Sequence, residues 1–184
     1  HIPETAPLCI HPLVLEVAEA VLGAGYVLAN NLKIKCCRPG AVAGRFHADW
    51  PIQAVAFPPR DAHMPPWGGL QVFWMLTQAT EQNGATRVVP FSHHTRREPT
   101  RADYTQALPI TGVPGTLLLF HNGLWHAAGA NTTNDAQRVL ANAYYVPGGV
   151  HPPEDRWNRI PSAAYDRLPT TLQALVSRSV HSAA

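Results

Sequence analysis

The sequence has few charged residues, little excess charge of either sign and no long apolar run, and each shortage excludes a class of protein. Lysine, arginine, aspartate and glutamate make up 14% of the 184 residues, and the formal net charge is +2. A nearly neutral chain without a run of basic residues gives no electrostatic basis for binding nucleic acid. No segment approaches the roughly 20 consecutive apolar residues of a transmembrane helix. We therefore expect neither a nucleic-acid partner nor a membrane span.

Cysteine is also scarce, and the pattern of the three cysteines argues against a disulfide scaffold. Their number is odd, and the neighbours Cys36 and Cys37 are poorly placed to pair with each other. No further Cys or His pair stands at zinc-finger spacing. The start of the chain, His1-Ile2-Pro3, lacks the charged-then-apolar order of a signal peptide. A reducing, cytoplasmic location is the expectation.

Proline and glycine, by contrast, are plentiful, with 18 and 13 residues spread along the chain. Such even punctuation predicts many short strands joined by turns, as in a β-sandwich or β-barrel. Apolar residues at helical spacing predict a helix over Pro12–Leu22, ended by Gly23. A second helical segment is predicted over about 161–182, interrupted near Pro169. We expect a single domain over 1–184 with a β core over about 30–150.

Several segments have the composition of strands. Residues 32–37 alternate, with Leu32, Ile34 and Cys36 on one face and the lysines on the other, which predicts a half-buried strand. Asn83-Gly84 predicts a hairpin between strands over 69–78 and 86–89. Further strands are predicted over 116–120, 124–128 and Arg138–Val146. The proline-rich segment 58–69 is a candidate lid because loops of that length in compact domains are usually functional.

One candidate metal-binding element is His47-Ala48-Asp49. Residues two positions apart lie on the same face of an extended segment, so the imidazole and the carboxylate can reach one ion. Such triplets also occur by chance among polar surface residues. This pair therefore needs support from elsewhere in the chain.

The second element is His126, which follows an apolar strand, together with Arg138. A histidine beside a core strand is often a packed, hydrogen-bonded residue, and a single arginine is often a surface ion-pair partner. In combination with His47 and Asp49, however, His126 completes the two-His, one-carboxylate set that holds iron(II) and leaves positions open. Arg138, followed by apolar residues, would supply a rigid fork for a carboxylate.

These residues lie within a longer pattern that resembles the phytanoyl-CoA dioxygenase family of iron(II)- and 2-oxoglutarate-dependent oxygenases. The resemblance spans about residues 10–150. It rests on Pro39-Gly40 through His47-Ala48-Asp49, on 70–77 with Asn83-Gly84-Ala85-Thr86-Arg87, Pro90 and Ser92-His93, and on Pro114-Gly115-Thr116, Trp125-His126, Gly129-Ala130-Asn131 and Arg138.

The resemblance implies a mainly β fold, a double-stranded β-helix (a cupin-like jelly roll) with flanking helices. It implies that His47, Asp49 and His126 bind Fe(II) and that Arg138 binds the distal carboxylate of 2-oxoglutarate. Trp74 falls where the family often lines the co-substrate pocket, although an ordinary core aromatic is an equal alternative. The chain departs from the family pattern at Phe91, where Gly is usual, and at Ala128, where many members have Ser.

The function expected from this resemblance is that of a 2-oxoglutarate-dependent dioxygenase. It would use Fe(II), 2-oxoglutarate and O2 to hydroxylate a small organic substrate, releasing succinate and CO2. Two alternatives remain at this point. One is a cupin-like metal enzyme that does not use 2-oxoglutarate, and the other is a non-catalytic relative that keeps the fold.

Overall fold

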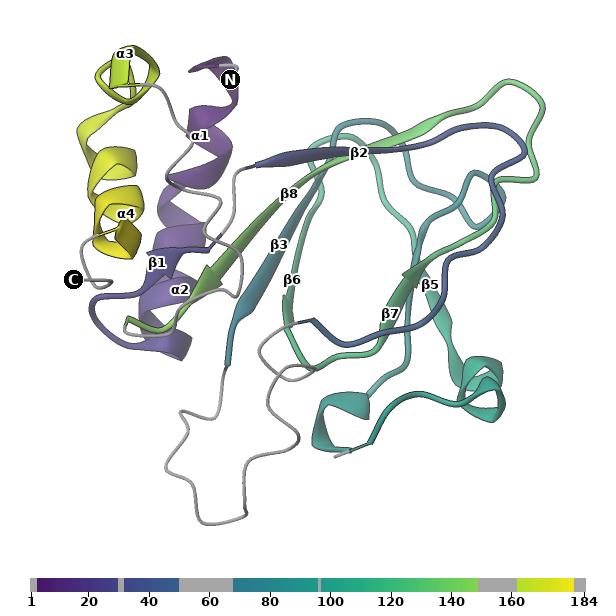
Figure 1. Cartoon of the computed structure of the whole chain (residues 1–184). Helices are drawn as coiled ribbons and strands as arrows, with labels where there is room; N and C mark the ends of the chain where they lie inside the picture. The colour runs from purple at the N-terminus through teal and green to yellow at the C-terminus, as the bar shows by residue number, and fades with distance from the viewer. Residues whose placement is uncertain (1–2, 30–31, 50–67, 96, 149–161, 181–184) are drawn as a thin grey trace.

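The computed structural model describes residues 3–29, 32–49, 68–95, 97–148 and 162–180, and consists of two facing antiparallel sheets with helices on one side (Figure 1). The larger sheet has the order β1-β8-β3-β6, with β2 also paired to β8, and the smaller has the order β5-β4-β7. This confirms the predicted double-stranded β-helix. The strands are β1 (Val27–Leu28), β2 (Lys33–Cys37), β3 (Leu70–Met75), β4 (Thr86–Val88), β5 (Leu108–Ile110), β6 (Leu117–His121), β7 (His126–Ala128) and β8 (Arg138–Val146).

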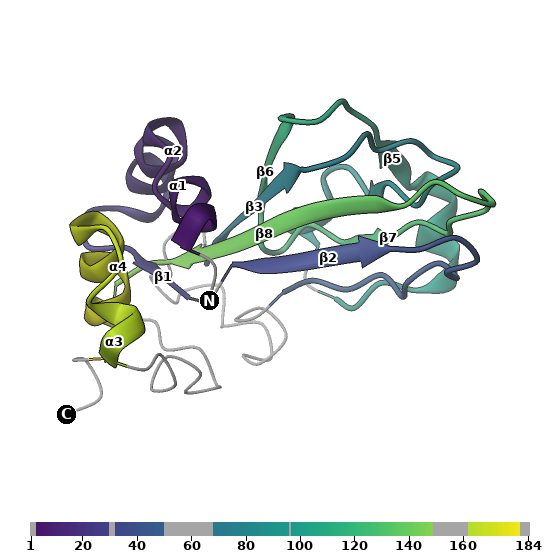
Figure 2. The ribbon, with the colours of Figure 1, turned by 90° about the horizontal axis from the view of Figure 1, so that it is seen from above.

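The helices cover the outer face of the larger sheet (Figure 1 and Figure 2). They are η1 (Pro3–Thr5), α1 (Ala6–Cys9), α2 (Pro12–Leu22), α3 (Ser162–Tyr165) and α4 (Thr170–Val180), while η2 (Ser92–His94) and η3 (Arg101–Gln106) lie near the smaller sheet. In the described part of the chain, no helix has the length and apolar character needed to cross a bilayer. The predicted bounds of the helix Pro12–Leu22 and the interruption at Pro169 are confirmed.

Strands β3 and β8 are buried on both faces, and the alternation of their side chains divides the molecule into two apolar layers. The outward-facing residues of both strands pack with buried residues of α2 and α4. The inward-facing residues include Phe73 and Leu140, which pack with Phe120 of β6 and form an apolar floor between the two sheets. This inner layer is where a site can be enclosed.

Two sequence-based expectations about local structure need correction. The Asn83-Gly84 hairpin is wrong, because β3 pairs with β6 and β8 whereas β4 pairs with β5 and β7 in the other sheet. Asn83 instead bridges Asn131. In β2 the strand itself is confirmed, but the predicted half-burial is wrong, because Cys37 is the single buried residue of the five and the face carrying the lysines is the one that points inward. The predicted lid lies outside the described residues except for its end at 68–69.

Phe91 is the single described non-glycine residue with positive φ, at φ 60° and ψ 2° in the left-handed region. Its ring is 77% exposed and therefore gains little from packing. We predict that Phe91→Gly stabilises the protein by about 1 kcal/mol, because glycine adopts this conformation without a steric penalty. Thermal denaturation would show a rise of about 2–4 °C. Phe91→Ala, which removes the ring but keeps the strained backbone, should not reproduce the gain; an equal gain would contradict the explanation.

Candidate metal centre

The segment containing His47 and Asp49 runs antiparallel beside β7. His47 N–H donates to the His126 carbonyl and His126 N–H to the His47 carbonyl, at 3.1 and 3.0 Å, and Asp49 N–H donates to Asn122 at 2.9 Å. These bonds set the two histidines opposite each other, with ring centroids 4.4 Å apart. The intervening Ala48 faces the other way and is buried. Extended geometry therefore presents His47, Asp49 and His126 on one inner surface, as their spacing predicts.

The donor atoms of this triad are oriented toward one point. The Nδ1 atoms of His47 and His126 each lie 3.0 Å from a backbone carbonyl oxygen, of Arg45 and Leu124 respectively. A carbonyl can only accept, so Nδ1 carries the proton and Nε2 keeps its lone pair. The two Nε2 atoms lie 3.8 and 3.4 Å from the Asp49 carboxylate. The ligand atoms of the triad all lie within 4.8 Å of one another, so the three residues could hold one metal ion.

Electrostatics also favour ligation at His126. Burial lowers the pKa of the His126 imidazole, the Asp49 carboxylate opposes this shift, and His47 adds to it. The lowered pKa keeps the ring neutral near pH 7, the form in which it binds a metal. His126 is buried, whereas the side chains of His47 and Asp49 are 43% and 25% exposed. The triad thus has one closed side and one side open to ligands.

Two buried amides hold the carboxylate in place. Gln71 Nε2 donates to Asp49 Oδ2 at 2.6 Å, and Asn142 Nδ2 donates to Gln71 Oε1 at 2.7 Å. Both amides come from inward-facing positions of β3 and β8. The sequence interpretation missed them, although a glutamine and an asparagine inside strongly apolar strands were the available signal.

We predict that Gln71→Leu lowers metal affinity about 10- to 100-fold, because the substitution removes the donor that orients Asp49. Titration with Mn(II) would measure the change. Gln78→Leu is the matched control, since it makes the same substitution at an exposed glutamine. Equal affinity for the two variants would refute the orienting role of Gln71.

Arg138 lies at the start of β8 on the same inner face. Its guanidinium is buried and donates from Nε and Nη2 to the Gly84 carbonyl at 3.0 and 2.8 Å. Gly84 has φ +88°, and a side chain there would meet the Cys37 sulfur, which explains the glycine of the Asn83-Gly84 pair. The carbonyl fixes one edge of the fork, and the Nη1 group is left to bind an anion.

Trp74, the other predicted co-substrate residue, lies on the opposite face of β3. Its indole N–H donates to the Leu8 carbonyl at 3.0 Å, and its ring packs in the core beneath the helices. The structure thus favours the core-aromatic alternative and does not bring Trp74 to the triad. Its neighbour Phe73 faces the site instead, with its ring centroid 6.2 Å from that of His126.

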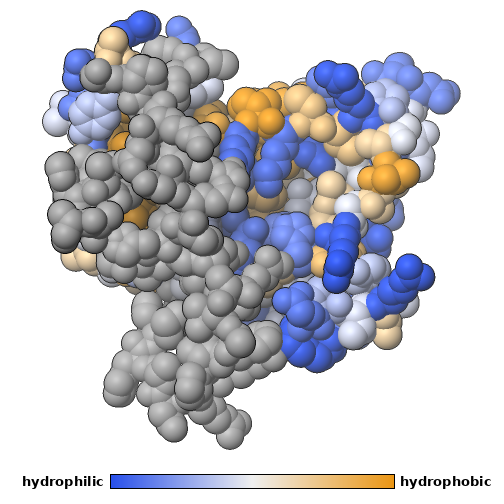
Figure 3. All heavy atoms as spheres, in the orientation of Figure 1, coloured by the Kyte–Doolittle hydropathy of each residue, from blue (hydrophilic) through white to orange (hydrophobic). Residues whose placement is uncertain are grey.

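Other histidines lie nearby without joining the centre. The ring of His93 lies 3.9 Å from that of His94 and 5.3 Å from that of His121, measured between centroids. In the residues that the structure describes, only the triad brings three potential ligand atoms together. In the space-filling view, hydrophilic side chains gather in the middle of the face, between the two sheets (Figure 3).

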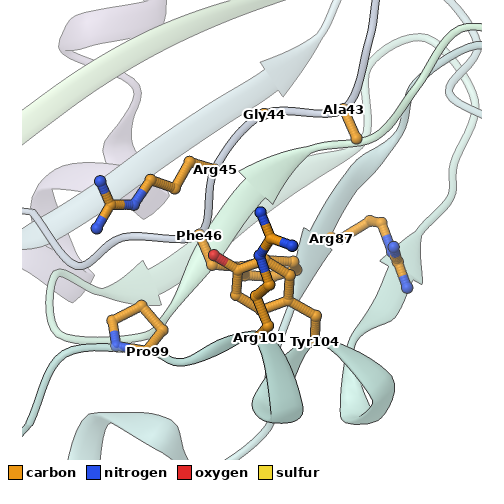
Figure 4. Close-up of a pocket in the computed structure, with 8 residues that line it drawn as sticks. All are labelled: Ala43, Gly44, Arg45, Phe46, Arg87, Pro99, Arg101 and Tyr104. Carbon is orange, nitrogen blue, oxygen red and sulfur yellow. The ribbon is translucent and has the colours of Figure 1, made fainter.

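A wide hollow of about 820 Å³ lies on the outer side of the smaller sheet (Figure 4). Arg45, Arg87 and Arg101 line it, but their guanidinium groups point in different directions (Figure 4). The adjoining 400 Å³ pocket is lined by Arg45, Phe46, His47 and Glu98, so it reaches one ligand of the triad. Asp49 and His126 line neither of these two pockets.

Comparisons with known proteins agree with the geometry. A model of the phytanoyl-CoA dioxygenase (PhyH) family matches residues 3–139. Dioxygenase af480 of Aspergillus fumigatus is 28% identical over 180 residues, covering 94% of this chain and 54% of that protein. Dioxygenase trt7 of Aspergillus terreus is 32% identical, covering 71% of this chain and 46% of that protein. The chain therefore spans about half the length of these curated relatives.

Solved structures show the same fold. EctD from S. alaskensis, crystallised with 2-oxoglutarate and 5-hydroxyectoine, is 24% identical with a TM-score of 0.65, over 79% of this chain and 53% of that one. The α-ketoglutarate-dependent epimerase SnoN is 23% identical with a TM-score of 0.60, over 89% of this chain and 65% of that one. At these identities the likeness establishes the jelly roll and leaves the reaction to be argued from the site.

Proposed function

Because the chain belongs to the phytanoyl-CoA dioxygenase family, we propose that it is an iron(II)- and 2-oxoglutarate-dependent dioxygenase acting on a small organic substrate. The observation that carries the proposal is the convergence of two Nε2 lone pairs and one carboxylate within 4.8 Å of one another. This donor set is that of the facial triad, which suits iron(II) and leaves positions for a co-substrate and oxygen.

Iron(II) held by His47, Asp49 and His126 would couple the oxidative decarboxylation of 2-oxoglutarate by O2, to succinate and CO2, to hydroxylation of a substrate C–H bond. The protein's own residues bind and orient the reactants. Arg138 binds the distal carboxylate of 2-oxoglutarate through the N–H groups that Gly84 leaves free. Phe73, Phe120 and Leu140 form an apolar floor against which the methylene groups of bound 2-oxoglutarate would pack.

A second candidate function, a jelly-roll metal enzyme that does not use a keto acid, keeps the triad but needs no buried cation beside it. Arg138 argues against this alternative, because burying a guanidinium without an anionic partner is unfavourable.

The free thiols Cys9, Cys36 and Cys37 are compatible with a cytoplasmic location. The packing of helices from both ends of the chain on one sheet supports a single oxygenase domain over 1–184.

The test is succinate formation by protein reconstituted with Fe(II) under air. Succinate should form only when Fe(II), 2-oxoglutarate and O2 are all present, and chelation of the metal should stop it. A panel of small organic acids and alcohols should include compounds that accelerate succinate formation. Metal binding without any binding of 2-oxoglutarate would support the keto-acid-independent alternative.

A further inference from the structure

The inner face of β2 carries Lys35, a cationic residue to which the proposed function assigns no role. In the strand register, Lys35 lies opposite Leu140 of β8, and Leu140 lies opposite Met75 of β3. Residues in register project from the same face of a sheet, so Lys35 points to the side that holds the triad. The side chain of Lys35 therefore lies on the inner face of the sheet, although β2 is an edge strand and the residue is exposed.

The position of the ammonium group is fixed by contact with the floor. Lys35 Nζ lies over the Phe73 ring, 5.1 Å from its centroid, which is within the range of a cation–π interaction. The same ring lies 6.2 Å from that of His126, measured between centroids. Phe73 is thus a neighbour of both His126 and Lys35, and the ammonium group lies over the apolar floor of the site.

Asp49 is the one carboxylate that acts on the Lys35 ammonium electrostatically among the described residues, and it does so without forming an ion pair with it. Across the described ranges it makes no hydrogen bond and no ion pair. Desolvation lowers the pKa of its ammonium, Asp49 opposes that shift, and Lys33 and Arg138 add to it. Two cations on one inner face, with an apolar floor beside them, form a site that favours an anion.

Arg138 is the natural partner for such a site. Cys37, which pairs with Arg138, is two residues along β2 from Lys35, so the two cations are diagonal cross-strand neighbours on one face. Diagonal neighbours with long side chains can bring their tips together on a shared ligand. Ala128, on the facing strand β7, has no polar side chain to contribute.

We propose that Lys35 and Arg138 together bind the distal carboxylate of 2-oxoglutarate, so that the co-substrate is held by two cations in this chain. This inference rests on the proposed function and deepens it. It assigns a co-substrate-binding role to a residue of β2 that is not itself a member of the metal-binding triad. A carboxylate between an ammonium and a guanidinium forms charge-assisted hydrogen bonds to both.

The experiment measures the Kd of 2-oxoglutarate by calorimetry under anaerobic conditions, with Mn(II)-loaded protein, so that no turnover is required. Lys35→Met keeps an unbranched apolar stem over Phe73 and removes the charge, and Lys35→Gln is a second variant should the first fold poorly. Lys33→Met, two residues earlier on the same face of β2, is the matched control. Pyruvate, which has the chelating keto acid but no distal carboxylate, is the matched ligand.

The proposal predicts that Lys35→Met raises the Kd of 2-oxoglutarate about 10- to 100-fold, leaves that of pyruvate unchanged, and is not reproduced by Lys33→Met. A Kd within threefold of the wild type would overturn it. Equal losses for 2-oxoglutarate and pyruvate would assign Lys35 to the chelating end and also overturn it. If wild-type protein binds Mn(II) but not 2-oxoglutarate, the proposed function itself fails, an outcome distinct from a selective effect of Lys35.

Discussion

His126→Ala is expected to abolish stoichiometric iron binding and, with it, 2-oxoglutarate-dependent succinate formation. His126 is the buried ligand of the triad, 4% exposed, and its Nε2 faces the Asp49 carboxylate at 3.4 Å. Removing a partner that merely orients a ligand typically lowers metal affinity 10- to 100-fold, so losing the ligand itself should exceed about 100-fold. Metal analysis after dialysis against Fe(II) would measure the stoichiometry.

His94→Ala is the control for this prediction, because His94 is exposed and does not belong to the triad. It should retain one iron per chain. Because a buried imidazole also contributes to packing, melting curves should establish that His126→Ala is folded at the assay temperature. Asp49→Ala removes a more exposed ligand and should give the same loss. Normal iron content in folded His126→Ala would exclude this residue as a ligand.

Arg138→Met is expected to leave iron binding intact and to weaken 2-oxoglutarate binding severely. Truncating one partner of a buried, hydrogen-bonded charge pair removes about 2–5 kcal/mol, which corresponds to at least about a 30-fold rise in Kd. The same substitution leaves the Gly84 carbonyl without its two donors, so unfolding should become easier by about 1–3 kcal/mol. Calorimetry and denaturant titration would measure the two effects separately.

Arg138→Lys should fall between the wild type and Arg138→Met, because it keeps the charge and loses the planar fork. Pyruvate binding should be insensitive to both substitutions. The combination separates the two functional groups of the site: His126→Ala loses the metal, whereas Arg138→Met keeps the metal and loses the keto diacid. Unchanged binding of 2-oxoglutarate by Arg138→Met would remove Arg138 from the co-substrate site and weaken the case for Lys35.

The sequence predicted the parts of the site that depend on local geometry. The two-residue spacing of His47 and Asp49 fixes their common face in any extended segment, and the bounds of β8 followed from its apolar composition. The pairing partner of the His47 segment did not follow, because it is β7, far along the chain. The hairpin predicted at Asn83-Gly84 was wrong for a related reason, because it too depends on which strands pair. Its dihedral preference suits a tight turn, but β3 and β4 join different sheets.

The sequence also did not show which of the two faces of a strand points into the site. All six residues of β3 are buried, so burial does not distinguish the face of Trp74 from that of Phe73, and Gln71 alone marked the inner face. In β2 the alternation is visible, but the usual expectation that the apolar face turns inward is reversed. Lys35 faces the site, and Ile34 faces solvent. Such a reversal is understandable at a site that binds an anion, where local consistency gives way to function.

Anomalous diffraction from crystals soaked anaerobically with Mn(II) would test the central claim most directly. The account predicts one strong peak bonded to His47 Nε2, His126 Nε2 and an Asp49 carboxylate oxygen, on the inner side of the two sheets. A principal peak elsewhere, for example among His93, His94 and His121, with the triad empty, would contradict it.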